Sequence, residues 1–253
     1  MKKIFYILVS LFITTSVAAQ GRVQDSLWQS ANDNYAMGDF NSAIEDYNAI
    51  VEGGFESAKL YYNLGNSYYR VRNMGMAVVC YKRALKLEPS NRDAKANLAM
   101  AKARCVDKIE QVPEFMVVTW IKSIRDSLSS NSWAIITLIG LFLLSILFLL
   151  FRFSRNRGGA KLSFILSLII LCAVIISLLF SLSAYNKAKG GDDAVVISAV
   201  GSVKSSPSQD GSPVFILHEG TEVEILETLE GWSKIEISDG RQGWMKNSEL
   251  EVI

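Results

Sequence analysis

Residues 133–182 read WAIITLIGLFLLSILFLLF RFSRNRGGAK LSFILSLIILCAVIISLLFSL, two long apolar runs separated by a short basic connector. Neither run contains a charged residue, and each is close in length to the ~20 residues that a helix needs to cross the hydrocarbon core of a bilayer. The stretch therefore predicts a transmembrane hairpin with helices at 133–151 and 162–182 and a loop at 152–161.

The connector indicates which way the hairpin is oriented. It holds Arg152, Arg155, Arg157 and Lys161 within ten positions. Short loops rich in Lys and Arg stay on the cytoplasmic side of a membrane. We therefore expect the segments before and after the hairpin to lie together on the opposite side.

The first residues have the pattern of a signal peptide at 1–19. Two lysines precede an apolar stretch, 4–13, that is too short to span a bilayer comfortably, and Val17-Ala18-Ala19 offers a small-residue cleavage site before Gln20. Without cleavage, the segment becomes a third span with its N-terminus inside. The domain that follows is exported in both cases.

The remaining composition is that of two small soluble domains. Half of the 253 residues are hydrophobic and the net charge is +1, but the apolar excess sits in the three segments above. Residues 20–112 carry 12 Lys and Arg against 11 Asp and Glu, whereas residues 194–253 carry 4 against 10. The acidic C-terminal part argues against nucleic acid as a partner.

The first soluble part, 20–112, is a repeat. Residues 24–57 and 58–91 align with a period of 34, the length of a tetratricopeptide repeat (TPR). The second copy resembles the TPR family at its signature positions, Tyr61, Leu64, Gly65, Tyr68, Ala77, Tyr81, Ala84 and Pro89. The first copy keeps Ala31, Gly38, Ala43 and Tyr47 but departs at Asn34 and Phe55, and a third fades after about Lys102. We expect two full repeats and a capping helix, with partner or membrane contacts as the alternative support.

The TPR resemblance implies that the concave face, lined by the first helix of each repeat, binds peptides or partner proteins. Asparagine amides can bond an extended main chain at both its donor and its acceptor, and arginine can hold a carboxylate. The alternative is that the tyrosines only pack and the asparagines are solvated. The positions that the resemblance assigns to the groove are Asn32, Tyr35, Tyr62, Asn63, Asn66, Tyr69, Arg70 and Asn97.

Two features flank the apolar runs. Residues 113–130 place apolar side chains at helical spacing, which predicts an amphipathic helix that either lies in the membrane interface or packs against the end of the TPR stack. Residues 183–193 are expected to form a flexible linker. In the second span, Ser163, Ser167, Ser177 and Ser181 share one face; they either pack against Gly140 and Ser145 or bond their own main chain.

Residues 194–253 change to a period of two. Strands are expected at 194–199, 214–217, 222–228, 233–237 and 243–246, which predicts a small all-β barrel. The segments Gly231-Trp232 and Asp239-Gly240-Arg241-Gln242-Gly243-Trp244 resemble the bacterial SH3 (SH3b) family. That resemblance implies binding of cell-wall peptides or protein segments on a shelf of Trp232 and Trp244, with Trp232 alternatively in the barrel core. From the acidic composition we expect a cationic or neutral peptide ligand.

No catalytic, cofactor or metal site is legible. His218 is the single histidine, and there is no phosphate-binding loop or CxxC pair. Cys80 and Cys105 either form a bridge in an oxidising compartment or, as we favour, remain reduced. We therefore expect no enzymatic activity. The fold class is multidomain, with an all-α TPR repeat, a two-helix transmembrane hairpin and an all-β SH3-like barrel.

The order of segments resembles the BatE-like proteins of the Bacteroides aerotolerance operon group. That resemblance implies a membrane-anchored adaptor, and with the orientation of the hairpin we expect a multi-pass protein of the bacterial inner membrane with both soluble domains in the periplasm. It implies membrane and periplasmic protein partners, among them von Willebrand factor A-domain proteins and another TPR protein, and a role in aerotolerance or envelope stress. The alternative is a sensor that binds peptidoglycan stem peptides through the SH3b domain.

Overall fold

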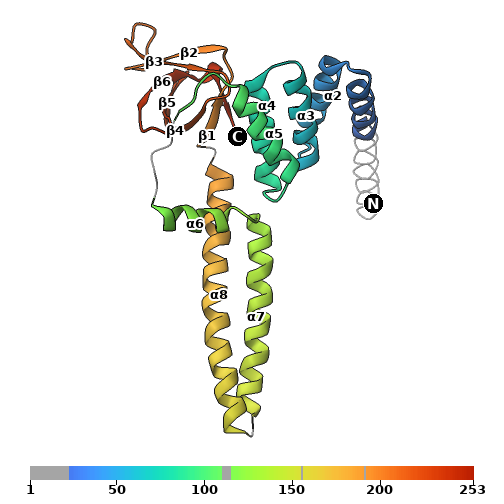
Figure 1. Ribbon diagram of the computed structural model, residues 1–253, viewed down its shortest axis with the longest axis vertical. Coiled ribbons are helices and arrows are strands. Elements are labelled where there is room, and N and C mark those ends of the chain that lie inside the picture. Colours follow the sequence, from blue (N-terminus) through green and yellow to red (C-terminus); the bar gives the residue numbers. More distant parts are fainter. Residues whose placement is uncertain (1–22, 110–114, 155, 191) are drawn as a thin grey trace, which may run out of the picture.

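The structure is a computed structural model that describes residues 23–109, 115–154, 156–190 and 192–253. A helical repeat and a β-domain lie side by side above a long helical hairpin (Figure 1). This arrangement confirms the expected fold class of helical repeat, two apolar helices and antiparallel β-domain. The expected signal peptide at 1–19 lies outside the described residues.

The repeat consists of antiparallel helices that each begin at a capping side chain. The first helix is described over 23–37 and is followed by α2 (Phe40–Glu52), α3 (Ala58–Arg70), α4 (Met74–Leu87) and α5 (Arg92–Arg104). A side-chain oxygen before each of α2 to α5 accepts a hydrogen bond from a main-chain N–H of the first turn, which satisfies a donor that the helix itself cannot. The capping residues are Asp39, Ser57, Asn73 and Asn91.

Small residues let the two helices of a repeat approach closely. A Cβ on Gly65 would lie 2.8 Å from the Tyr81 ring. Ala31, Ala43 and Ala77 are fully buried where the helices cross. After α5 the chain does not add the second helix of a third repeat, and the β-domain packs there instead.

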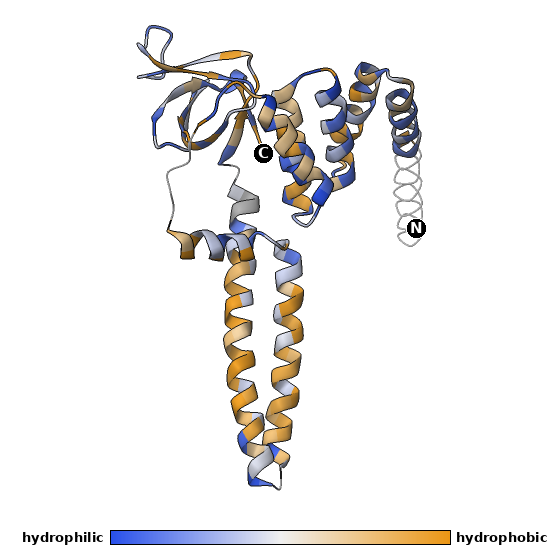
Figure 2. Cartoon of the chain, in the orientation of Figure 1, coloured by the Kyte–Doolittle hydropathy of each residue, from blue (hydrophilic) through white to orange (hydrophobic). Residues whose placement is uncertain are grey.

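The hairpin is formed by α7 (Ser130–Phe153) and α8 (Arg157–Gly190), both long and apolar enough to cross a membrane. Figure 2 shows that hydrophobic residues make up most of the length of both helices. The loop between them is shorter than the expected 152–161. The expected linker at 183–193 is instead helical as far as Gly190, because the segment after Leu182 is rich in the helix formers Ala and Lys and contains no proline.

The hairpin packs through small and polar side chains near its upper end, where the Thr137 and Ser177 hydroxyls lie 2.8 Å apart. A Cβ on Gly140 would lie 2.4 Å from Val174, so the helices touch there. Farther down, Ser167 donates to the Ser163 carbonyl of its own helix. Ser177 also donates to the Val174 carbonyl of its own helix over 3.0 Å, so own-helix bonds occur in both halves, and the upper half has contacts between the helices as well.

A short helix, α6 (Met116–Arg125), lies across the top of the hairpin (Figure 1). None of its residues is buried, and the exposed fraction of Trp120 is 67%. It is fixed to the spans because the Trp133 indole donates to the Arg125 carbonyl over 2.9 Å. The Arg125 guanidinium also donates to the Ser183 hydroxyl over 3.2 Å. The helix is shorter than the expected 113–130.

The β-domain is one bent antiparallel sheet in the order β3-β2-β6-β5-β4-β1-β7. It has seven strands where the sequence predicts five. The chain bends after Val196, so the expected strand at 194–199 ends early, and Gly201 and Ser202 weaken the pattern of the strand that follows. The strands are β1 (Asp193–Val196), β2 (Val200–Lys204), β3 (Pro213–His218), β4 (Glu222–Leu229), β5 (Trp232–Glu236), β6 (Gln242–Lys246) and β7 (Leu250–Val252).

Strand β1 belongs to two cores at once. Ala194 and Val196 point into the β-domain core, whereas Val195 is fully buried in a cluster with Val78, Val79 and other residues of the repeat. Val195 lies directly between Glu222 of β4 and Glu251 of β7 in the strand register. The face that the β-domain presents to the repeat is thus a row of three residues, in which Val195 lies between the carboxylates of Glu222 and Glu251.

Basic side chains of the repeat form ion pairs with the carboxylates of this row. Glu222 lies 3.1 Å from the Lys82 Nζ and 2.5 Å from the Lys102 Nζ. On the other side of Val195, the Arg83 guanidinium lies 2.6 Å from Glu251. Opposite charges and a shared apolar contact therefore fix the β-domain against α4 and α5.

Asp107, just beyond α5, completes the contact. Its carboxylate accepts hydrogen bonds from the His218 main-chain N–H over 2.7 Å and the Thr221 hydroxyl over 2.6 Å. The His218 Nδ1 lies 2.8 Å from the second oxygen. Burial acts to raise the pKa of Asp107, but these hydrogen bonds outweigh it and hold the pKa below its usual range.

Candidate functional site

The groove asparagines form a ladder that crosses from one repeat to the next. The Asn63 amide donates to the Asn32 Oδ1 over 3.3 Å, and the Asn97 amide donates to the Asn66 Oδ1 over 2.8 Å. Each rung also receives a buried tyrosine hydroxyl, because Tyr47 donates to Asn32 and Tyr81 donates to Asn66. The same three-residue arrangement recurs 34 positions later.

The ladder leaves specific atoms for a ligand. The oxygens of Asn32 and Asn66 each accept two hydrogen bonds, which saturates them. Within the described part of the chain, no side-chain bond uses the Asn66 Nδ2 or the Oδ1 of Asn63 and Asn97. These asparagines therefore offer a ligand one amide donor and two amide acceptors, the kinds of group that pair with a peptide main chain.

Arg70 is exposed but held in place. Its guanidinium stacks 4.3 Å from the centre of the Phe40 ring, whose edge also contacts Tyr35 at 5.2 Å. Stacking leaves the in-plane N–H groups of an arginine free to bind a carboxylate. Phe40, which sequence reasoning missed, is therefore the residue that positions both Tyr35 and Arg70.

The other two tyrosines have different surroundings. Tyr62 packs 6.2 Å from the Tyr81 ring and its hydroxyl accepts from Asn97 over 3.4 Å, so it is part of the ladder. Tyr69 lies apart, with the Arg104 guanidinium 4.4 Å from its ring. The structure thus brings seven of the eight groove positions into two groups and leaves Tyr69 apart. One group is the Tyr35–Arg70 pair, and the other is the ladder of Asn32, Tyr62, Asn63, Asn66 and Asn97.

The tryptophan shelf of the β-domain lies on the outer face of β5 and β6. Trp232 has an exposed fraction of 9%, lower than a ligand shelf requires. It is buried, with the Nζ of Lys204 at 5.5 Å and of Lys246 at 6.0 Å from its ring centre. This burial favours the structural alternative for Trp232 over an open ligand shelf.

Trp244 is the more accessible ring, and it too is placed between lysines. In the strand register it faces Lys204 on one side and Lys234 on the other. All three lysines of residues 194–253 thus surround the two tryptophans. We call the face made by Trp232, Trp244 and these lysines the Trp–Lys face. The expectation of a cationic or neutral ligand was drawn from the net charge of the domain, which does not show that its three lysines gather on this face.

The cysteines and the histidine that the sequence analysis considered for chemistry are buried or engaged in contacts. Cys80 and Cys105 are both buried and unbridged, and burial raises the pKa of the Cys80 thiol to about 12. His218 is engaged with Asp107 at the domain contact. Among the described residues, no group of three or more His, Cys, Asp or Glu is arranged to hold a metal ion.

Comparison with known families identifies two modules in the chain. The tetratricopeptide repeat model matches residues 58–91, and the bacterial SH3 domain model matches residues 198–251. No curated protein matches the chain. The chain therefore combines a tetratricopeptide repeat with a bacterial SH3 domain, two modules that typically bind proteins or peptidoglycan and do not catalyse reactions.

Proposed function

We propose that the protein is a non-enzymatic, membrane-anchored adaptor that binds partner proteins through the TPR groove and the SH3b domain. The observation that carries this proposal is the pairing of two recognition surfaces on one docked unit, held above a hairpin whose apolar runs contain no charged residue. Ion transport or a proton relay would need ionisable groups within the spans.

The proposed location is the bacterial inner membrane, with both soluble domains in the periplasm. The basic loop of the hairpin supports this orientation. The test is labelling of single cysteines in a cysteine-free background with a membrane-impermeant maleimide. Ser208→Cys in the β-domain should react in intact spheroplasts, whereas Gly159→Cys in the loop should react only after lysis. The reverse pattern would invert the topology.

The TPR groove is proposed to hold an extended segment that ends in, or carries, a carboxylate. The alternating ladder atoms would bond its main chain and Arg70 its acid group. Crosslinking in intact membranes followed by affinity purification tests this, with a Tyr62→Ala, Asn66→Ala, Arg70→Ala variant compared with the wild type. A control variant replaces the exposed Glu45, Glu52 and Arg92 with Ala. Loss of a discrete set of partners from the groove variant alone is expected; an unchanged set would refute groove binding.

The physiological setting is proposed from the resemblance in domain order alone. It suggests an aerotolerance or envelope-stress complex containing von Willebrand factor A-domain proteins and a second TPR protein. The same crosslinking experiment identifies the captured proteins. Partners without such domains would remove this setting while leaving the adaptor proposal intact.

A second candidate is a cell-wall sensor that binds peptidoglycan stem peptides through the SH3b domain. The Trp–Lys face favours it, because stem peptides carry carboxylates that lysines attract. The test is retention of the full-length protein on purified sacculi. Trp244→Ala should reduce retention, and Leu226→Ala, at an exposed position elsewhere on the sheet, should not. Equal retention of all three proteins would exclude this face as the binding site.

A further inference from the structure

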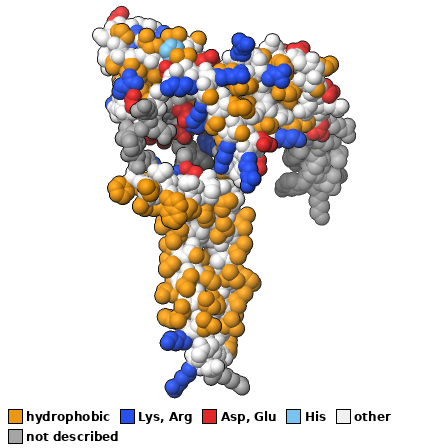
Figure 3. All heavy atoms as spheres, in the orientation of Figure 1, with side chains coloured by type: hydrophobic (Ala, Val, Ile, Leu, Met, Phe, Trp, Pro, Cys, Tyr) orange, Lys and Arg blue, Asp and Glu red, His pale blue; other side chains and the backbone are white. Residues whose placement is uncertain are grey.

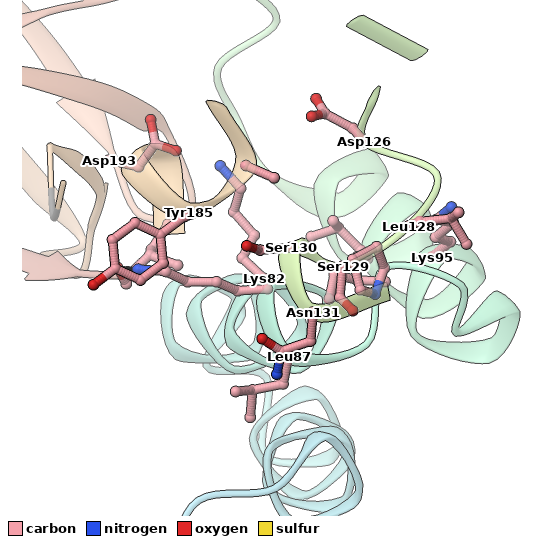
Figure 4. Close-up of a pocket in the computed structure, with 16 residues that line it drawn as sticks. Lys82, Leu87, Lys95, Asp126, Leu128, Ser129, Ser130, Asn131, Tyr185 and Asp193 are labelled. Atoms are coloured by element: carbon pink, nitrogen blue, oxygen red, sulfur yellow. Dashed lines mark hydrogen bonds between the residues drawn. The ribbon is translucent and has the colours of Figure 1, made fainter. Parts of the chain in front are cut away.

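A cavity of about 480 Å³ lies where the repeat, the β-domain and the top of the hairpin meet. Its upper wall is the underside of α4 and α5, and its lower wall is formed by the start of α7 and the upper part of α8. Figure 4 shows side chains from both walls around the cavity, with Lys82, Lys95 and Leu87 from the repeat and Ser129, Ser130 and Tyr185 from the hairpin.

The cavity lies at the level where the apolar surface of the hairpin ends. Ser130 is the first residue of α7, and Tyr185 follows the second apolar run by three positions. Helix α6, with Trp120 exposed, crosses the hairpin beside this level (Figure 3). In a membrane-inserted protein, this is the depth of the lipid headgroups.

The cavity combines cations with an apolar wall. Three lysines line it, and of these Lys82 is paired with Glu222 and Lys86 donates to the Ile253 main-chain oxygen. Lys95 is exposed and makes no side-chain hydrogen bond or ion pair with the described residues. The apolar part of the repeat-side wall is Leu85, Leu87 and Leu98.

Two acidic side chains, Asp126 and Asp193, also line the cavity. They differ in how they affect the positive charge of the lysines. Asp126 is engaged by the neighbouring Arg125 guanidinium at 2.6 and 3.0 Å. Asp193 lies at the β-domain end, across the cavity from Lys95 in Figure 4. The repeat-side wall at Lys95 is therefore the positive part of the cavity.

We propose that this cavity binds the phosphate headgroup of a membrane phospholipid, with Lys95 as its principal ligand and the leucines against the glycerol and first acyl carbons. A phosphate is the anion that a bilayer presents at this depth, and it lies next to apolar chain, which matches a lysine beside leucines. The proposal rests on the membrane anchoring proposed above. It gives the repeat a direct contact with the membrane, in addition to the hairpin.

The test uses the full-length protein in nanodiscs of phosphatidylcholine with a minor fraction of phosphatidylglycerol. Native mass spectrometry after release counts the phospholipids that stay bound. Lys95→Gln should lower retention of phosphatidylglycerol about tenfold, the effect of losing one charge-assisted hydrogen bond. Lys95→Arg should keep it. The matched control is Lys59→Gln, an exposed lysine on α3 that does not line the cavity, and it should match the wild type.

Three further outcomes test whether the bound phosphate belongs to a lipid, whether the site exists, and whether the protein is anchored in the membrane. Displacement of the bound lipid by excess glycerol phosphate would overturn the lipid assignment in favour of a soluble phosphate ligand. Equal retention by wild type and Lys95→Gln would overturn the site itself. Extraction of the protein by alkaline carbonate would show that anchoring fails, which is distinct from a protein that remains inserted but retains no lipid.

Discussion

At the residue scale, Asn66 links the stability of the repeat to its binding surface. Its side-chain oxygen accepts from the buried Tyr81 hydroxyl and from Asn97, while its amide nitrogen makes no side-chain hydrogen bond with the residues that the structure describes. Burial raises the pKa of Tyr81 well above its usual value, so this hydroxyl stays protonated and acts as a donor. A donor buried in this way needs its acceptor.

We expect Asn66→Ala to lower the free energy of unfolding by about 2 kcal/mol, because it leaves the Tyr81 hydroxyl without its acceptor. In a Tyr81→Phe background the same change should cost less, since the hydroxyl is already gone. Chemical denaturation of the four proteins gives the coupling. Additive effects of the two changes would mean that the hydrogen bond contributes nothing to stability.

The residue scale also shows what the sequence could and could not predict at the groove. The family positions identified the asparagines and Arg70, because the repeat period places equivalent residues at equivalent sites. Phe40 and Arg104 were missed, since neither is a signature residue and their roles arise from ring contacts across helices. The lysines around the tryptophans were missed because net charge hides where charges gather.

At the element scale, the two turns between the helices of a repeat differ in the residue at their left-handed position. Gly38 and Arg72 occupy equivalent positions 34 apart, and both adopt a left-handed backbone, with φ of 87° and 63°. Glycine takes this conformation freely, whereas an arginine side chain is strained there. The second repeat therefore has a less favourable turn than the first.

Arg72→Gly is expected to raise the free energy of unfolding by about 0.5 to 1 kcal/mol, since relief of the left-handed strain exceeds the entropy that glycine adds to the unfolded chain. Arg72→Val should lower it. Thermal unfolding of both variants, measured beside the wild type, checks the sign. A destabilising glycine would show that the Arg72 side chain makes a contact worth more than the strain.

Strand β1 illustrates the limit of pattern reading for elements. Its residues Ala194 to Ile197 are a continuous apolar run, although strands with one buried face alternate. The sequence predicts a strand here, and the structure has one, but the second face of this strand is buried because Val195 packs against the repeat. No local pattern identifies a partner surface more than a hundred residues earlier in the chain.

Val195→Ala should cost about 2 kcal/mol of docking free energy, because two buried methyl groups leave a cavity between the domains. Amide hydrogen exchange should rise in α4 and β1 together while the core of β5 stays protected. The matched control is Val200→Ala, at a position with an exposed fraction of 62%. Faster exchange throughout the β-domain would instead indicate that Val195 stabilises that domain alone.

At the scale of the whole molecule, carboxylates hold the two soluble domains together. For Glu222, burial acts to raise the pKa, but Lys82 and Lys102 outweigh it and lower the pKa from its usual 4.5. The pKa of Asp107 is likewise lowered from its usual 3.8. A depressed pKa in the folded state stabilises at pH values above the unfolded pKa, and the contribution is lost as the pH falls through the folded value.

Docking of the domains is therefore expected to be insensitive to pH near neutrality and to weaken below about pH 4.5, where these carboxylates take up protons. Asp107→Asn should weaken docking by about 1 kcal/mol at neutral pH and flatten the acid limb. Small-angle scattering of the full-length protein in detergent, recorded against pH, reports domain separation. Constant dimensions down to pH 3 would contradict this.

The charged row around Val195 has a consequence for recognition. It fixes the distance and angle between the asparagine ladder and the Trp–Lys face, so a ligand long enough to reach both meets two pre-aligned sites. Once one end is bound, the other end is confined near its site at a local concentration far above that in solution, and weak contacts combine into a slowly dissociating complex. Two modest binding modules on a rigid joint can then select partners by the spacing of their motifs.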